Sequence, residues 1–316
     1  MKRICKIFFC MLTVIIALFC VTSCDENGEN GTNGGNNGGI QNGTVEDKID
    51  KEYTDINEYF NVCHVTNSGN NVIIKYDLDE NAEINFGAVV LDNSKTYIFE
   101  FGNQSKFVKI TGDNAKTFNN VRFSVLSRDS AFNLALENVT FAGTDAVIKS
   151  NAPVLNLGLY GANCTVRCDK ASNGYVGEEF GALQIGNGGN GGNGANGATP
   201  IVCDGILNVI CGAKSSITGG NGGDGGRGGN SQSSGSHGGN GGNGGNGAVA
   251  ISATEINVSF VNEMTEKDLL IYGGAGGLGG EKGWGMNIFW IGKANPGNDG
   301  AKGISASASN VDINYK

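Results

Sequence analysis

Apolar and polar residues alternate in short runs along the chain, and one run recurs at a regular spacing. It is an asparagine followed by an apolar residue, any residue and a second apolar residue, and the first three copies begin at Asn120, Asn138 and Asn156. Successive side chains of a strand point to opposite faces, so each copy predicts a β-strand with one buried face. The equal spacing of 18 residues between these asparagines predicts a structural repeat.

Later copies of the motif are separated by stretches rich in glycine. The copies begin at Asn208, Asn257 and Asn310, and the glycine-rich stretches cover residues of about 186–199, 219–247 and 273–303. When these stretches are left out, the remaining intervals are close to one or two 18-residue units. We therefore expect glycine-rich inserts in a coiled scaffold, with the recurrent asparagines stacked at a bend from coil to coil.

The expected fold class is all-β: a single-stranded parallel β-helix, or β-solenoid, with coils of about 18 residues. The sequence leaves the hand of the coil open, and we take it as right-handed. Before the first strands, residues 46–60 place Ile49, Tyr53 and Ile56 at helical spacing, which predicts a short helix. This helix either covers the open N-terminal end of the solenoid or lies at its periphery.

The glycine-rich inserts carry asparagine at every third position, as at Asn240, Asn243 and Asn246. Three prolines in the whole chain exclude collagen, and GGNGGDGG at 219–226 has Gly226 where a calcium-binding nonapeptide needs an apolar residue. A disordered linker is the remaining alternative, but it has no need of a period. Extended polyglycine II helices with three residues per turn explain the period, because bare glycine ridges let neighbouring helices pack closely.

These features resemble two kinds of protein. Over residues 186–303 the chain is similar to the polyglycine II sandwiches of phage tail-fibre adhesins, and over about 80–316 it resembles bacterial parallel β-helix surface proteins. The first resemblance implies inserts that present a binding surface at their tips.

The third insert departs from the glycine pattern and contains both tryptophans of the chain. Trp284, Met286, Phe289 and Trp290 form an apolar stretch that predicts a recognition tip, since aromatic side chains provide much contact area at small entropic cost. The alternative is that they pack against the glycine helices or cap the last coil. The ridge of Asn240, Asn243 and Asn246 is the second candidate binding surface.

The N-terminus predicts export and lipid anchoring. Residues 1–23 read as a signal peptide, with Lys2, Arg3 and Lys6 before an apolar run too short to span a bilayer. The run ends in Val-Thr-Ser-Cys, which resembles the bacterial lipobox and identifies Cys24 as the lipidated residue. Residues 24–45 read as a flexible Gly/Asn-rich tether, and residues 46–316 as the solenoid domain. We expect a lipoprotein on a bacterial membrane, at the cell surface.

Charge and cysteine content narrow the possible partners. Without the three basic residues of the signal peptide, 19 basic and 31 acidic side chains leave a net charge of −12, which argues against nucleic acid. Outside the signal, five cysteines remain: Cys63, Cys164, Cys168, Cys203 and Cys211. Cys164 and Cys168 alternate with polar residues, so we expect buried core thiols, with a disulfide or a metal pair as alternatives.

No pattern in the chain indicates catalysis. Arg128-Asp129 and Glu178-Glu179 stand in expected turns without a partner at coil spacing, and no cofactor or metal site is predicted. We expect a non-catalytic adhesin or recognition scaffold that presents its inserts to a glycan or a protein on another cell or matrix. A structural envelope protein is the alternative, and a β-helix polysaccharide lyase or hydrolase is the third.

Overall fold

The structure is a computed structural model that separates into two compact units, Met1–Asn42 and Gly43–Lys316. It describes residues 64–76, 82–88, 91–102, 107–113, 116–261, 263–286, 295–302, 306–307 and 310–315. All of these lie in the second unit. The signal peptide, Cys24, the tether, Cys63 and the helix expected in residues 46–60 lie outside the described residues.

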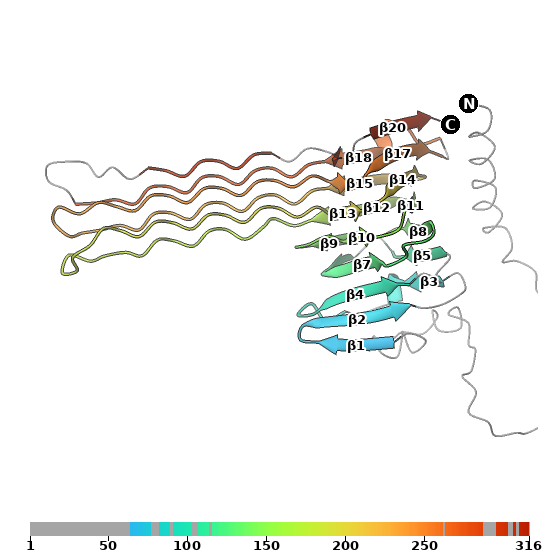
Figure 1. The fold of residues 1–316 in the computed structure, drawn as a ribbon, viewed down its shortest axis with the longest axis horizontal. Helices are drawn as coiled ribbons and strands as arrows, with labels where there is room; N and C mark the ends of the chain where they lie inside the picture. The colour runs from blue at the N-terminus through green and yellow to red at the C-terminus, as the bar shows by residue number, and fades with distance from the viewer. Residues whose placement is uncertain are drawn as a thin grey trace, which may run out of the picture. The chain divides into compact units, whose positions relative to one another are not determined.

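The described residues form three sheets (Figure 1). The first sheet contains β1 (His64–Ser68), β2 (Asn71–Tyr76), β4 (Thr96–Phe101), β7 (Val121–Val125), β10 (Ile148–Ser150), β13 (Ile201–Cys203), β16 (Ile251–Ser252) and β19 (Ala306–Ser307). The second contains β3 (Ala82–Asn85), β5 (Phe107–Thr111), β8 (Phe132–Glu137), β11 (Val154–Tyr160), β14 (Ile206–Cys211), β17 (Glu255–Phe260) and β20 (Asn310–Tyr315). The third contains β6 (Thr117–Asn119), β9 (Thr140–Gly143), β12 (Asn163–Cys168), β15 (Lys214–Thr218) and β18 (Leu269–Tyr272).

The chain passes through the three sheets in a repeating order. After β7, β8 and β9, for example, β10 pairs with β7, β11 with β8 and β12 with β9, in each case in parallel. The antiparallel pair β1–β2 lies at one edge of the first sheet. The helices in the described residues are two short 3-10 turns, Phe86–Ala88 and Glu266–Asp268, and neither could span a bilayer. The expectation of an almost entirely β protein with parallel strands is confirmed.

The predicted repeat length of 18 residues is wrong. In the part without inserts, paired residues lie 23 to 26 positions apart, from Asn133↔Asn156 to Phe107↔Asn133. Asn120 precedes β7 in the first sheet and Asn138 precedes β9 in the third, whereas Asn156 lies on β11 in the second. We call one passage of the chain through the three sheets a circuit. The spacing of 18 therefore linked strands of three different sheets and did not measure the length of a circuit. The strands could be confused because every strand of such a fold has the same alternating pattern.

An asparagine ladder does exist, but with other members and at another place. Asn133, Asn156, Asn208 and Asn257 are in register along the second sheet, and Nδ2 of each of the last three donates to Oδ1 of the one before at 2.8–3.0 Å. The ladder thus lies on strands, not at a bend. Asn120 and Asn138 have φ of 58° and 56° and serve as turn residues. Asn310 pairs with Glu255, so Asp312 takes the place opposite Asn257.

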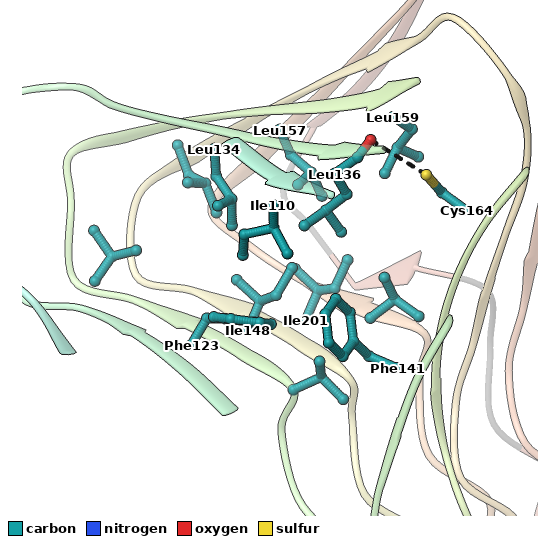
Figure 2. Close-up of a cluster of buried hydrophobic side chains, with 14 of the residues drawn as sticks. Ile110, Phe123, Leu134, Leu136, Phe141, Ile148, Leu157, Leu159, Cys164 and Ile201 are labelled. Atoms are coloured by element: carbon teal, nitrogen blue, oxygen red, sulfur yellow. Dashed lines mark hydrogen bonds between the residues drawn. The ribbon is translucent and has the colours of Figure 1, made fainter. Parts of the chain in front are cut away.

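The core lies between the sheets, where the inward residues of successive strands stack in rows. Figure 2 shows Phe123, Ile148 and Ile201 of the first sheet facing the second-sheet row that includes Leu136 and Leu159. Alternation produces these rows, since every second residue of strands such as β4, β7 and β14 is buried. Because the pairing is parallel and in register, each row continues through neighbouring circuits.

Four cysteines belong to this core. Cys164, Cys168, Cys203 and Cys211 are buried free thiols, which confirms the interpretation of core thiols and leaves no disulfide among them. Cys164 Sγ donates to the Leu136 carbonyl at 3.2 Å (Figure 2). Burial raises the pKa of Cys168 to about 12 and that of Cys211 to about 11, which keeps both thiols protonated and unreactive at neutral pH.

Candidate functional site

Three long connections leave the circuits at the same corner, between a strand of the third sheet and the next strand of the first. They are residues 169–200, 219–250 and 273–305, and they are nearly equal in length. The first begins well before residue 186, where the glycine content rises. In Figure 1 the described parts of the three connections run side by side away from the strands.

Each connection runs outward as one extended arm and returns as another. We number the arms 1 to 6 in chain order and call them together the array: residues 171–180, 188–198, 219–230, 238–248, 273–284 and 295–301. Backbone hydrogen bonds join the arms with a period of three residues. Gly191, Gly194 and Gly197 of arm 2, for instance, donate to the carbonyls of Asn240, Asn243 and Asn246 of arm 4, each at 2.8 Å.

The inner arms bond on several sides. Arm 3 donates to arms 2 and 5 and accepts from arms 1 and 4, in every case with N···O distances of 2.7–2.9 Å. A Cβ added at Gly226 would collide with the Tyr175 carbonyl, and one at Gly242 with the Gly192 carbonyl. Arms 3 and 4 accordingly have two glycines in each three residues, whereas the outer arms 1 and 6, which bond to fewer neighbours, have one.

The asparagines between the glycines complete this hydrogen bonding. Oδ1 of Asn240 accepts the N–H of Asn295 at 2.7 Å, and Asn240 donates its own N–H to Oδ1 of Asn190 at 2.9 Å. Asn243 and Asn246 repeat the arrangement with Asn193 and Asn298, and with Asn196 and Ala301. The predicted ridge of Asn240, Asn243 and Asn246 is therefore present, exposed to solvent and held in one orientation by its neighbours.

The array has two unlike faces. Arms 2, 4 and 6, with the residue just before arm 2, present one set of exposed asparagines, which we call the amide face: Asn187, Asn190, Asn193, Asn196, Asn240, Asn243, Asn246, Asn295 and Asn298. Arms 1, 3 and 5 present mixed side chains on the other face, including the ion pairs Lys170–Asp224 and Arg227–Glu179.

Asp224, the acidic residue of GGNGGDGG, belongs to this mixed face. Its Oδ1 accepts the N–H of Leu278 at 2.9 Å, as an asparagine would, and its Oδ2 pairs with Lys170. The hydrogen bond from Lys170 and the one from Leu278 lower the pKa of Asp224. Within the described residues no group of three His, Cys, Asp or Glu side chains is placed to hold a metal ion.

At the far end of the array the tip of the middle insert is enclosed by the other two. Ser231 forms bridges with Phe180 of the first insert and Gly285 of the third, and its Oγ donates to the Gly186 carbonyl at 2.7 Å. Ser231, Ser233 and Ser236 are buried. The SQSSGSH loop, residues 231–237, therefore joins the outer tips. His237 is half-buried, and its Nδ1 has no hydrogen-bond partner in the described chain.

The two outer tips expose apolar side chains. In the third insert Trp284 and Met286 are 58% and 47% exposed, while Phe289 and Trp290 lie outside the described residues. In the first insert Leu183 and Ile185 are 100% and 97% exposed. This pair lies before residue 186, where the first insert was expected to begin, and so was not among the predicted site residues. The available signal was Gly174 and Gly177, which repeat the spacing of three and mark arm 1.

The residues considered for catalysis are not brought together. Glu179 pairs with Arg227 on the mixed face of the array, whereas Arg128 and Asp129 lie in the connection between β7 and β8. Comparisons of the chain with protein-family models, with curated proteins and with solved structures find no match.

Proposed function

We propose that residues 46–316 form a right-handed, three-sided parallel β-helix whose inserts pack as a bundle of six polyglycine II helices. The repeating passage through three sheets supports the β-helix, and parallel crossover connections are strongly biased to the right hand. The period of three in the hydrogen bonds between arms supports the polyglycine II assignment.

We propose further that this domain is the recognition part of an exported lipoprotein, anchored at Cys24 to a bacterial membrane and exposed at the cell surface. It is a non-catalytic scaffold that holds the tip of the bundle toward a glycan or a protein of another cell or matrix. The observation that carries this proposal is the exposure of Leu183, Ile185, Trp284 and Met286 at the end of the array.

Trp284 is the last residue of arm 5, and the other three side chains lie beyond the ends of the arms. Leu183 and Ile185 contribute almost nothing to internal packing, since nearly their whole surface is open to water. Exposed apolar groups of this size on a rigid support are typical of interaction sites. The middle tip fixes the spacing between them through the Ser231 bridges.

The test is adhesion of cells that display the full chain to surfaces coated with glycans or matrix proteins. We expect a variant with Leu183→Ser, Ile185→Ser and Trp284→Ala to lose adhesion by about tenfold or more, while its circular dichroism stays unchanged. Tyr272→Ala is the matched control, because Tyr272 is an exposed aromatic residue at the other end of arm 5. Undiminished adhesion of the tip variant, or envelope fragility without an adhesion defect, would favour a structural role instead.

A further inference from the structure

The amide face consists of oriented hydrogen-bond donors. In arms 2 and 4 each asparagine uses Oδ1 to accept a backbone N–H of the next layer, at 2.7–2.9 Å. Since Oδ1 faces this N–H, the Nδ2 group of the same amide points away from it. The described residues supply no acceptor to any Nδ2 of the nine asparagines, all of which are exposed.

The last layer of this face is a second, independent observation. Arm 6 ends the series, so within the described chain no further backbone N–H reaches Oδ1 of Asn295 or Asn298. A purely structural ladder has no use for an amide there. Arm 5 ends the opposite face, and its series at the equivalent positions contains no asparagine. Ala275, Leu278 and Trp284 donate their backbone N–H groups to the layer below, and their side chains offer no acceptor; Glu281 stands at the remaining position.

We propose that the amide face binds a neutral polysaccharide in an extended conformation. Along one arm the asparagines are three residues apart, which corresponds to about 9 Å in a polyglycine II helix. A polymer of repeating sugar units presents hydroxyl and ring oxygens at a regular spacing, and these oxygens accept from the Nδ2 groups. The binding free energies of many weak hydrogen bonds then add up, because the asparagine side chains are already held in place and lose little conformational freedom on binding.

Charge and composition select this ligand class over others. The nine side chains that form the amide face are uncharged amides, and the chain has a net charge of −9, which opposes a polyanion. The half-buried His237 continues the row of Asn240, and the face has none of the Trp, Tyr or Arg side chains that dominate protein–protein interfaces. What remains is a ligand that is uncharged, polar and repetitive.

The inference deepens the proposed function, from which it takes the polyglycine II geometry and the exposure at the cell surface. It uses a different surface from the tip, however, so the two can fail separately. Loss of tip adhesion with intact polysaccharide binding, or the reverse, identifies which surface is responsible.

The experiment exchanges asparagine for aspartate on the middle arm of the amide face. Asn240→Asp with Asn243→Asp keeps Oδ1 as the acceptor for the next layer, as Asp224 does on the other face, but removes the Nδ2 donors. The matched control is Asn173→Asp with Asn221→Asp, which adds the same charge to the mixed face at two residues that also accept a backbone N–H.

The full chain in detergent is run on native gels that contain hydroxyethyl cellulose, yeast mannan or dextran, with polygalacturonate as the anionic comparison. We expect retardation by at least one neutral polymer, weakened about fivefold or more in the amide-face variant and unchanged in the control and in the tip variant. The proposal is overturned by the absence of retardation in all three neutral polymers, by equal retardation of the amide-face variant, or by preferential binding of polygalacturonate.

Discussion

At the residue scale, the amide side chain performs two tasks in this protein. On the second sheet Asn133, Asn156 and Asn208 bond to one another, donor to acceptor, along the strands. In the array Asn240 accepts a backbone N–H and leaves its donor exposed. The ladder on the second sheet depends on an identical residue one layer away, whereas in the array the partner is a backbone N–H, which Ala301 supplies to Asn246 as well as Asn295 does to Asn240. This is why the register, and not the count of asparagines, decides their role.

Asp224 tests whether a carboxylate can replace the asparagine amide as the side-chain acceptor for a backbone N–H of the next arm. Its pKa is lowered by Lys170 and by the N–H of Leu278, so its contribution to stability is present above the pKa of the unfolded chain and is lost as the pH falls through the lower, folded value. We expect thermal unfolding of the native chain to lose stability relative to Asp224→Asn below about pH 4. Asparagine keeps the acceptor without titrating. A stability difference that does not change between pH 7 and pH 3 would contradict this role.

At the element scale, the number of neighbours decides the glycine content of each arm. Arm 3 lies among four other arms and has two glycines per turn, while arm 1 has one and carries side chains such as Tyr175 and Val176 on its open sides. The period of three was visible in the dense arms and predicted their mutual packing. Arm 1 was missed because a sequence with one glycine in three reads as an ordinary loop.

Gly226 and Gly181 form a matched pair for this argument. Gly226→Ala places a methyl group against the Tyr175 carbonyl, so we expect a loss of unfolding free energy of about 1–3 kcal/mol or more. Gly181→Ala lies at the tip, where the nearest atom to the new Cβ is Gln184 Oε1 at 3.8 Å, and should leave stability unchanged or slightly raised. Chemical denaturation of both variants provides the measurement. Equal effects of the two substitutions would mean that the arms are not packed as described.

At the scale of the whole Gly43–Lys316 unit, the array is closed at both ends. A Cβ added at Gly242 would meet the Gly192 carbonyl of arm 2. A Cβ added at Gly192 would instead meet the ring of Tyr175 of arm 1, which covers this side of the stack. At the other end Pro296 has no N–H to donate, and Asp299 uses its carboxylate to accept from Gly279. Such ends prevent further glycine-rich segments from adding to the stack, as edge strands of sheets are protected.

The middle insert should hold the outer two in place, since arms 3 and 4 bond to arms on both sides. Replacing residues 220–247 by a short turn is expected to leave the β-sheet circular dichroism largely intact. Chymotrypsin should then cleave at Tyr175 and Trp284, which the native array protects. Removing only residues 181–186 is the control and should leave both sites protected. Rapid cleavage at Tyr175 in the native chain would show that the inserts are independent of one another.

The sequence by itself determined the strands, because alternation of apolar and polar residues directly reports which face of a strand is buried. It likewise predicted a repeating extended structure in the first two glycine-rich stretches, since glycine and asparagine at a period of three have no purpose in a slack linker. Cys164 and Cys168 were placed on one buried face for the same local reason.

Only the tertiary structure decided the length of the circuit, the members of the asparagine ladder and the composition of the tip. Each depends on which residues, 23 to 55 positions apart, become neighbours, and every strand of the chain offers nearly the same pattern for pairing. Leu183 and Ile185 became a candidate surface only when arm 1 was seen to pack beside arm 3. The amide face likewise exists because three separate inserts are held in register by the circuits from which they emerge.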